Sequence, residues 1–300
     1  MTGYAELQVT TNYSFLSGAS HPEELFAQAK LLGLPALGIT DRNSLAGIVA
    51  CHQRAAEAGV RMLVGCRLDL TDGTSFLVYP QSRPGYARLC RLLTLGKSRA
   101  GKGGCDLAWQ DVAAHADELL CVLLPDQPDE ALRSSLARLR ADFGDRASLA
   151  LTLHRRPGDA VRLHRLAEAA VAARVPTVTT GDVLYHAPQR RVLQDVMTCI
   201  REGCAIDDAG FRRERFADRY LRPPEEMARL FARHPDAVAR TLEIVDRCPF
   251  DLRELRYQYP AELEDPVLTP QQTLEKLTWE GAVRRFPEGV PDDEIGRAHV

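Results

Sequence analysis

The chain has 300 residues, of which 45% are hydrophobic and 26% are charged, and its formal net charge is −3. That length and apolar content suffice for one large core, or for one core with a small appendage. No apolar run follows a basic start, and no stretch reaches the ~18 apolar residues of a membrane span, so we predict neither a signal peptide nor a membrane helix. The small negative net charge does not by itself indicate a nucleic-acid-binding protein.

The eight cysteines indicate reduced thiols in a cytoplasmic protein. No two of them form a Cys-x-x-Cys pair, and most lie in apolar runs. Cys199 and Cys204 are close enough in sequence to begin a zinc site, but no second pair completes it. We therefore predict thiols packed in the core rather than disulfides or a metal centre.

Short apolar runs alternate with amphipathic stretches over the first 185 residues. A turn signal at Asp72-Gly73 separates two of the runs. The predicted strands lie at residues 7–9, 36–39, 62–64, 75–79, 119–124, 149–153 and 176–179, and a further apolar run at 68–70 precedes the turn. About seven strands with helices between them predict an α/β fold, either a parallel (β/α) barrel or a doubly wound sheet. In such folds, chemistry takes place at the carboxyl ends of the strands.

Beyond Tyr185 the pattern predicts helices, three of which begin at Pro188, Pro223 and Pro235. A first domain is therefore predicted over residues 1–250. Residues 251–293 are irregular at first and rich in proline, which is typical of a linker into a further region. The last residues, 294–300, match the translation of a common sequencing adapter. We expect them to be an assembly artefact and the native protein to continue beyond them.

Three polar side chains directly follow predicted strands. Asp41 follows the strand at 36–39, Asp182 the strand at 176–179, and His154 the strand at 149–153. Because the carboxyl ends of barrel strands meet at one mouth, we expect these side chains to share a cleft suited to a metal or to acid–base chemistry. An aspartate after a strand is also a common helix cap, so the spacing alone leaves both interpretations open.

A series of short motifs resembles the PHP domain that opens the α subunits of bacterial C-family DNA polymerases. Each motif is weak alone, but their order and spacing over residues 4–291 are specific. The PHP-like motifs lie at residues 13–19, 39–41, 64–66 and 181–183, and further similarity lies at 193–196 and 255–260. Residues 279–282 and 286–289 resemble the error-prone branch of that family. The resemblance implies a PHP-like distorted (β/α) barrel followed by helices and by the start of a polymerase core.

The positions that this resemblance assigns to metal ligands are mostly replaced. Metal-dependent PHP domains begin with His-x-His, carry further ligands after the Thr-Asp and Gly-Cys motifs, and end with Asp-x-His. The corresponding residues here are Gln8, Thr10, Arg42, Arg67 and Leu184, so that only Asp41, Asp182 and the candidate His154 keep donor types. A three-metal site needs more donors than these. We therefore predict a degenerate PHP cleft that holds no metal and catalyses neither hydrolysis nor proofreading.

The same positions suggest that arginine takes over the charge of the lost metals. Two carboxylates left in one cleft would repel each other, and a guanidinium can pair with a carboxylate permanently. We predict that a guanidinium nitrogen of Arg67, and less strongly of Arg42, lies within ~4 Å of Asp41 or Asp182.

For the whole protein, the resemblance implies a DNA-directed DNA polymerase for damage-induced, error-prone translesion synthesis in the cytoplasm. Its partners would be template-primer DNA, deoxynucleotides and accessory proteins of mutagenesis. Polymerisation requires paired aspartates that hold two metal ions, and no Asp-x-Asp occurs in this chain. We therefore expect Mg²⁺ in the remaining polymerase core, no cofactor here, and a structural or docking role for this domain.

Two other functions remain open from the residues. One is a free-standing PHP phosphoesterase similar to histidinol phosphatases, although the absent histidines at Gln8, Thr10 and Leu184 argue against it. The other is a non-catalytic binding module.

One segment is basic in spite of the acidic average. Residues 73–105 contain six Lys or Arg and no Asp or Glu. The glycine-rich end, residues 96–104, is predicted to be a flexible loop whose Lys97, Arg99 and Lys102 contact DNA phosphates. A second arginine cluster, at 212–222, is partly neutralised by Glu214 and Asp218. In both places the alternative is a solvated surface.

Overall fold

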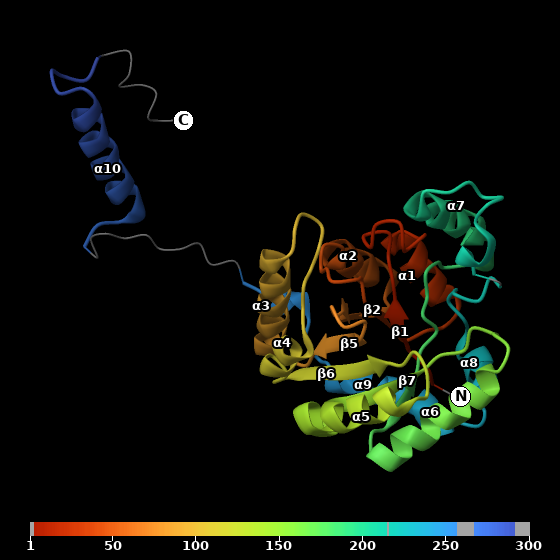
Figure 1. Cartoon of the computed structure of the whole chain (residues 1–300). Helices are drawn as coiled ribbons and strands as arrows, with labels where there is room; N and C mark the ends of the chain where they lie inside the picture. The colour runs from red at the N-terminus through yellow and green to blue at the C-terminus, as the bar shows by residue number, and fades with distance from the viewer. Residues whose placement is uncertain (1–2, 215, 257–266, 292–300) are drawn as a thin grey trace. The chain divides into compact units, whose positions relative to one another are not determined.

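The computed structural model describes residues 3–214, 216–256 and 267–291 (Figure 1). The chain forms two compact units, Met1–Glu254 and Leu255–Val300. The predicted artefact at 294–300 lies outside the described residues, and so does the middle of the predicted linker. The division at residue 250 and the start of a polymerase core at 251–293 stay predictions.

The first unit contains two β-sheets. The smaller sheet is parallel, with the order β1-β2-β3. Its strands are β1 (Glu6–Val9), β2 (Ala36–Ile39) and β3 (Arg61–Val64). The larger sheet has the order β4-β5-β6-β7-β8, antiparallel from β4 to β6 and parallel from β6 to β8. Its strands are β4 (Cys66–Asp69), β5 (Ser75–Pro80), β6 (Leu119–Leu124), β7 (Ala147–Leu151) and β8 (Thr177–Thr179).

The α/β class is as predicted, but the strands form two sheets that do not close into one barrel, so the predicted distorted barrel of about seven strands is not confirmed. Only single bridges, Val9 to Val183 and Arg42 to Arg67, join the two sheets in the described part of the chain. The Asp72-Gly73 turn folds β4 and β5 into an antiparallel hairpin, which interrupts the βα repeat that a parallel barrel requires. At the change of sheet only Gly65 separates β3 from β4, and a Cβ there would lie 2.8 Å from the Tyr79 ring.

Helices surround the sheets of the first unit (Figure 1). They are α1 (Pro22–Leu31), α2 (Ile48–Ala58), α3 (Arg83–Arg99), α4 (Trp109–Ala114), α5 (Glu130–Phe143), α6 (Asp159–Ala173), α7 (Arg191–Glu202), α8 (Pro224–Leu230) and α9 (Pro235–Arg247). The helices predicted to begin at Pro188, Pro223 and Pro235 are present, the first as a 3-10 turn that continues into α7 and the second from Pro224.

Helix α3 corrects the prediction of a flexible basic loop at 96–104. Ser82 caps the helix by accepting a hydrogen bond from the Gly85 amide at 3.2 Å. Gly96 does not end the helix, because it is buried where a Cβ would lie 2.7 Å from Leu107. Lys97 and Arg99 therefore belong to the last helical turn, and of the three predicted phosphate ligands only Lys102 lies in a loop.

The core of the first unit contains free thiols, as predicted. All eight cysteines are reduced, and Cys51, Cys66, Cys121, Cys199 and Cys248 are buried. Burial raises the pKa of the Cys66 and Cys51 thiols, so both stay protonated and behave as small apolar side chains.

The second unit contains helix α10 (Pro270–Arg285). Thr269 and Gln272 form a capping box at its start, with Pro270 in the first turn. Across the part of the chain that the structure describes, no helix is both long and apolar enough to span a membrane.

Gly18 provides a test of the packing beside β1. A Cβ at this position would lie 2.1 Å from the Thr11 carbonyl oxygen, which is backbone and cannot move aside cheaply. We expect Gly18→Ala to lower the free energy of unfolding by ~1–3 kcal/mol in urea denaturation, because the 11–19 loop must shift. Gly101→Ala is the control, since no atom lies within 4 Å of its added Cβ. Equal stability of the two variants would contradict the described loop.

Candidate functional site

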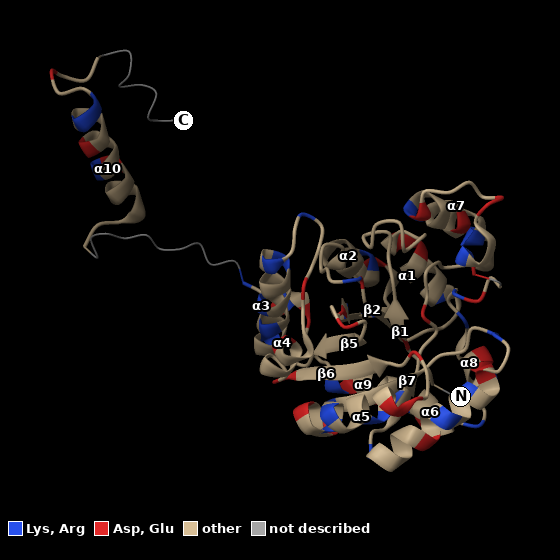
Figure 2. Cartoon of the chain, viewed as in Figure 1, with Lys and Arg blue, Asp and Glu red and all other residues tan. Residues whose placement is uncertain are grey.

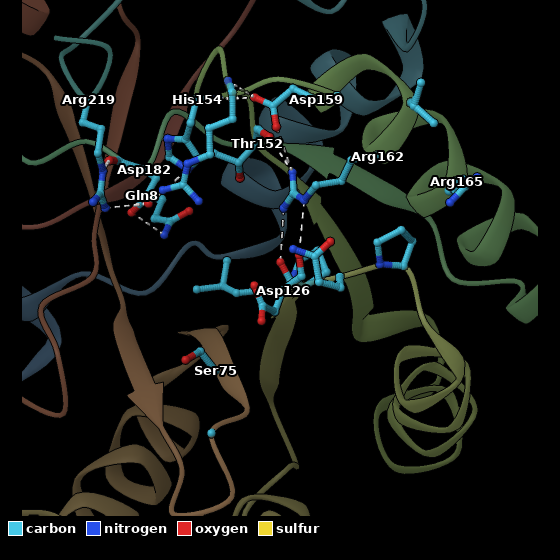
Figure 3. Close-up of a pocket in the computed structure, with 18 of the residues that line it drawn as sticks. Gln8, Ser75, Asp126, Thr152, His154, Asp159, Arg162, Arg165, Asp182 and Arg219 are labelled. Atoms are coloured by element: carbon cyan, nitrogen blue, oxygen red, sulfur yellow. Dashed lines mark hydrogen bonds and ion pairs between the residues drawn. The ribbon is translucent and has the colours of Figure 1, made fainter. Parts of the chain in front are cut away.

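A cleft of about 850 Å³ opens at the strand ends of the first unit (Figure 3). Gln8 enters it from β1, Ser75 from β5, His154 from the segment after β7, and Asp182 from the segment after β8. The predicted meeting of Asp182 with His154 at one mouth is therefore present, and His154 Nε2 lies 3.6 Å from Asp182 Oδ2.

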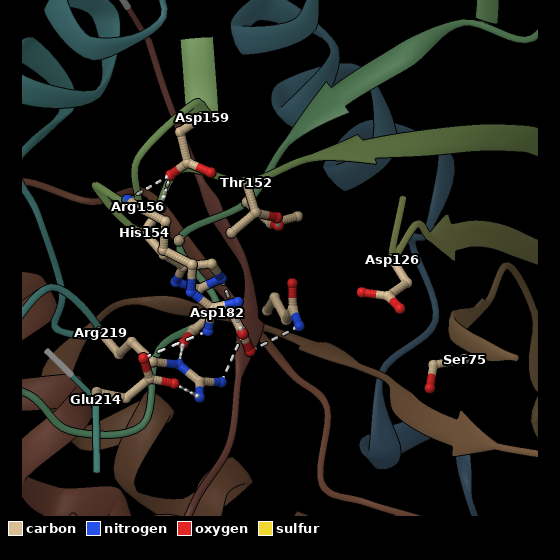
Figure 4. A network of polar contacts seen from close by, with 12 residues as sticks. Ser75, Asp126, Thr152, His154, Arg156, Asp159, Asp182, Glu214 and Arg219 are labelled. Atoms are coloured by element: carbon tan, nitrogen blue, oxygen red, sulfur yellow. Dashed lines mark hydrogen bonds and ion pairs between the residues drawn. The ribbon is translucent and has the colours of Figure 1, made fainter. Parts of the chain in front are cut away.

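Asp182 is held by the side chains of Gln8 and Arg219 (Figure 4). Gln8 Nε2 donates to its Oδ1 at 2.8 Å, and Arg219 Nη2 lies 2.5 Å from its Oδ2. Arg219 Nε also donates to the Asp182 backbone oxygen at 2.9 Å. The residue has a φ of +48°, a left-handed conformation that these contacts keep in place.

The guanidinium of Arg219 decides the charge of this carboxylate. Burial alone would raise the pKa of Asp182, but Arg219, followed by His154 and Arg67, outweighs burial and brings the pKa to about 2. Asp182 is therefore ionised at neutral pH. Burial lowers the pKa of His154, so the imidazole is neutral there. Two atoms of the cleft, Gln8 Oε1 and His154 Nδ1, are buried without a protein partner.

Backbone pairing brings Arg219 to Asp182 across 37 residues of sequence. The amides of Leu184 and Tyr185 both donate to the Arg219 carbonyl, at 2.9 and 3.2 Å. Glu214 Oε1, 3.4 Å away, supports the guanidinium from its other side. Sequence reasoning placed this arginine only within a charge cluster, because no local motif indicates so distant a pairing.

Asp41 does not line this cleft. It lies buried behind it and anchors the 11–19 loop. The Thr11 amide and the Ser14 hydroxyl donate to Oδ1 at 2.8 and 2.7 Å, and the Thr11 hydroxyl donates to Oδ2 at 2.8 Å. Burial raises the pKa of Asp41, and these donors partly oppose that shift. The remaining substituted positions are also structural, since Thr10 is buried and Leu184 packs in a small apolar cluster with Ala19.

The predicted pairing of Arg67 or Arg42 with the two aspartates is wrong. Among the described residues, the ion-pair partner of both arginines is Asp69, with Arg67 Nε at 2.8 Å from Oδ1 and Arg42 Nε at 2.7 Å from Oδ2. Arg67 and Asp69 are two apart on β4 and so share one face of the strand. A guanidinium does neutralise Asp182, but it comes from Arg219.

The metal that a PHP fold implies does not fit these residues. Both carboxylate oxygens of Asp182 already accept bonds from cationic or amide donors, and Asp41 accepts three further bonds away from the cleft. No group of three or more His, Cys, Asp or Glu side chains in the described ranges is arranged to hold a metal ion. A divalent ion at Asp182 would have to displace Arg219 against charge repulsion.

The buried carboxylate of Glu6 accepts hydrogen bonds from backbone amides beside the site. Oε1 accepts from the Gln8 and Gly181 amides at 2.8 and 3.1 Å, while Oε2 is 2.6 Å from the Tyr4 hydroxyl. A Cβ on residue 181 would lie 2.4 Å from Oε2, which explains the glycine before Asp182. Burial raises the pKa of Glu6 to about 7, in spite of these bonds. Sequence reasoning missed Glu6, because one acidic residue at the start of a strand carries no signal.

The predicted DNA-contact residues are separated by the fold. Lys97 and Lys102 line a different hollow, beside the 11–19 loop, whereas the guanidinium of Arg99 pairs with Asp111 at 2.6 Å.

Comparison with known proteins identifies the families that this chain resembles. Residues 6–152 match the family model of the PHP domain. The chain is 58% identical over 289 residues to error-prone DNA polymerase 1 of Agrobacterium fabrum, and 57% identical over 288 residues to error-prone DNA polymerase 2 of Rhizobium meliloti. Each alignment covers 96% of this chain and 26% of the relative, so the chain spans about a quarter of their length.

A solved structure of an amidohydrolase from Chromobacterium violaceum aligns with 61% of this chain and 88% of its own, at 15% identity and a TM-score of 0.42. A similarity at this level does not show that the two proteins share an activity.

Residues 6–152 of the first unit thus match the PHP domain, and the cleft brings together Gln8, His154 and Asp182 from the predicted set. The chain as a whole is related to the bacterial error-prone DNA polymerases.

Arg219→Ala tests the ion pair with Asp182. Removing one partner of a largely buried pair leaves the other charge uncompensated, so we expect a loss of ~3 kcal/mol, the lower end of the range for fully buried pairs, in urea denaturation at pH 7. Arg42→Ala is the matched control, because Arg42 is half exposed beside Asp69 and should cost less than ~1 kcal/mol. Since the folded pKa of Asp182 lies below 3.8, the stabilisation is complete above pH 4 and is lost as pH falls toward 2. Equal losses from both variants would contradict this account.

Glu6→Gln tests the buried acid through pH. The unfolded chain releases this proton near pH 4.5 and the folded chain near pH 7, so the folded form holds more protons between these values. Stability should therefore fall as pH rises through that window, by up to about 3 kcal/mol for the single group. In Glu6→Gln this slope should disappear, whereas Glu23→Gln, on the exposed face of α1, should keep it. An unchanged slope in Glu6→Gln would show that the carboxyl is not perturbed.

Proposed function

We propose that this chain is part of an error-prone DNA-directed DNA polymerase, a nucleotidyltransferase that extends a primer with deoxynucleotides in damage-induced translesion synthesis. The observation that carries the proposal is the 58% identity to error-prone DNA polymerase 1 of Agrobacterium fabrum over 96% of this chain. The proposal places the reaction in the cytoplasm, on template-primer DNA, and allows accessory proteins of mutagenesis as partners.

The polymerase chemistry itself is assigned to another part of that protein. Two metal-bound aspartates must activate the primer hydroxyl and stabilise the departing pyrophosphate. The present sequence contains no Asp-x-Asp. The magnesium ions therefore belong to a polymerase core in the three quarters of the relatives' length that this chain does not span.

We infer that the PHP domain of this protein is a non-hydrolytic, structural domain. The support is the chemistry of the cleft. Arg219 forms an ion pair with Asp182, and Asp41 accepts a hydrogen bond from Ser14 of the 11–19 loop. The rival function, a free-standing PHP phosphoesterase, requires donors at Gln8, Thr10 and Leu184 that these side chains do not supply. The ion pair of Asp182 and Arg219 would instead tie the end of the β8 segment to the chain that leads into α8.

The proposal predicts different outcomes for two assays. The chain, incubated with Mn²⁺ or Zn²⁺ and a 5′-labelled single strand, should release no nucleotides, because no metal site forms. The protein translated from the complete gene, given Mg²⁺ and deoxynucleotides, should extend a primer across a template lesion.

Controls separate the two parts of the proposal. Metal-dependent turnover that is lost in Asp182→Asn would show that the cleft is hydrolytic. Failure of the complete protein to extend an undamaged primer would remove the polymerase assignment, whatever the cleft does.

A further inference from the structure

A second hollow lies between the 11–19 loop and the end of α3. Its volume is about 740 Å³. Two aromatic side chains, Tyr13 and Phe15, and two lysines, Lys97 and Lys102, line it. We call it the loop groove. Its one acidic lining residue, Asp69, is already paired with two arginines, so the groove presents positive charge.

The lysines of the loop groove carry charge that the fold does not neutralise. Helix α3 has basic side chains along its length and no acidic one (Figure 2). Arg88 pairs with Asp117 and Arg99 with Asp111, but within the described ranges no ion pair engages Lys97 or Lys102, both of which are exposed. These two ammonium groups are free to meet an anionic ligand.

The aromatic side chains are displayed by a rigid loop. Phe15 is 84% exposed and Tyr13 is 42% exposed. The loop is fixed by the Ser14 hydroxyl, which donates to Asp41, and Tyr13 packs so closely on Gly47 that a Cβ there would lie 2.6 Å from its ring. Because the loop backbone is anchored, less conformational freedom is lost when a flat group stacks on these rings than if the loop were unanchored.

We propose that the loop groove binds single-stranded DNA, with bases stacked on Phe15 and Tyr13 and phosphates at Lys97 and Lys102. This inference rests on the proposed polymerase function for the choice of DNA. Aromatic rings interleaved with cations suit an unpaired strand, because the faces of paired bases in a duplex are already stacked. The groove is separate from the contacts of Asp182, and Arg42 lines both hollows.

The test is fluorescence anisotropy of a labelled 20-nucleotide oligo-dT with the 300-residue chain, over a range of salt concentrations. The double variant Lys97→Ala/Lys102→Ala should weaken binding and reduce the slope of log K against log salt by about 1.4, or about 0.7 for each lost phosphate contact. Phe15→Ala should weaken binding roughly ten-fold and leave the salt slope unchanged.

Two controls match these changes. Arg91→Ala removes an exposed cation from α3 that does not line the loop groove, and Phe211→Ala removes a fully exposed ring elsewhere. Both should leave affinity within two-fold of the original chain. Equal losses in Arg91→Ala, or unchanged binding in Phe15→Ala, would overturn the proposal. Thermal unfolding of each variant checks that the fold is intact.

The failure of this inference is distinguishable from failure of the proposed function. If the complete protein extends primers but none of the groove variants changes oligo-dT binding, the loop groove is not a strand site and the polymerase assignment stands. If the groove variants lose binding while the complete protein extends no primer, the groove is a strand site in a protein with another activity.

Discussion

The organisation of the cleft depends on one buried ion pair. Arg219 reaches Asp182 from a distant segment and contacts both its side chain and its backbone oxygen. The carboxylate can remain ionised there only because a permanent cation compensates its burial. The same contact fixes the turn after β8, which Glu6 supports from below through the Gly181 amide. A metal ion and this guanidinium would compete for the same oxygens of Asp182.

Asp41, which the PHP resemblance assigns to a metal ligand position, has a structural role in this chain. Its three hydrogen bonds organise the loop that follows β1, and the loop in turn presents Tyr13 and Phe15 at the surface. The carboxylate of Asp41 thus organises the loop that presents these aromatic rings near the end of α3. Burial raises the pKa of this carboxyl group, so its anchoring also depends on the donors around it.

The sequence predicted the local elements well because they depend on local patterns. The strands β2 and β6 have the predicted bounds, and helices begin at or beside the predicted prolines. The predicted barrel is not confirmed, because the connection at residues 70–74 makes β4 and β5 antiparallel, and the number of strands alone does not predict their direction. The last turn of α3 was predicted as loop because a glycine such as Gly96 often ends a helix. In the structure this glycine instead allows Cys105 and Leu107 to pack closely against the helix.

The sequence predicted where some residues of the site lie in the fold, but not which side chains contact one another. The sequence places Asp182 and His154 at strand ends, which is a local property, and the structure brings them together. The sequence does not indicate that Arg219 rather than Arg67 neutralises Asp182. That pairing depends on hydrogen bonds between segments far apart in the chain. Strand alternation instead directs Arg67 to Asp69, its neighbour on the same face of β4.

The most direct test of this account is the pKa of the Asp182 carboxyl group, measured by ¹³C NMR on chain labelled at aspartate and assigned with Asp182→Asn. If Arg219 has replaced the metal charge, the resonance titrates with a midpoint of about 2 and does not respond to Mn²⁺ or Zn²⁺ at neutral pH. A midpoint at or above the ordinary 3.8, or a resonance that shifts or broadens on addition of either ion, would contradict the account.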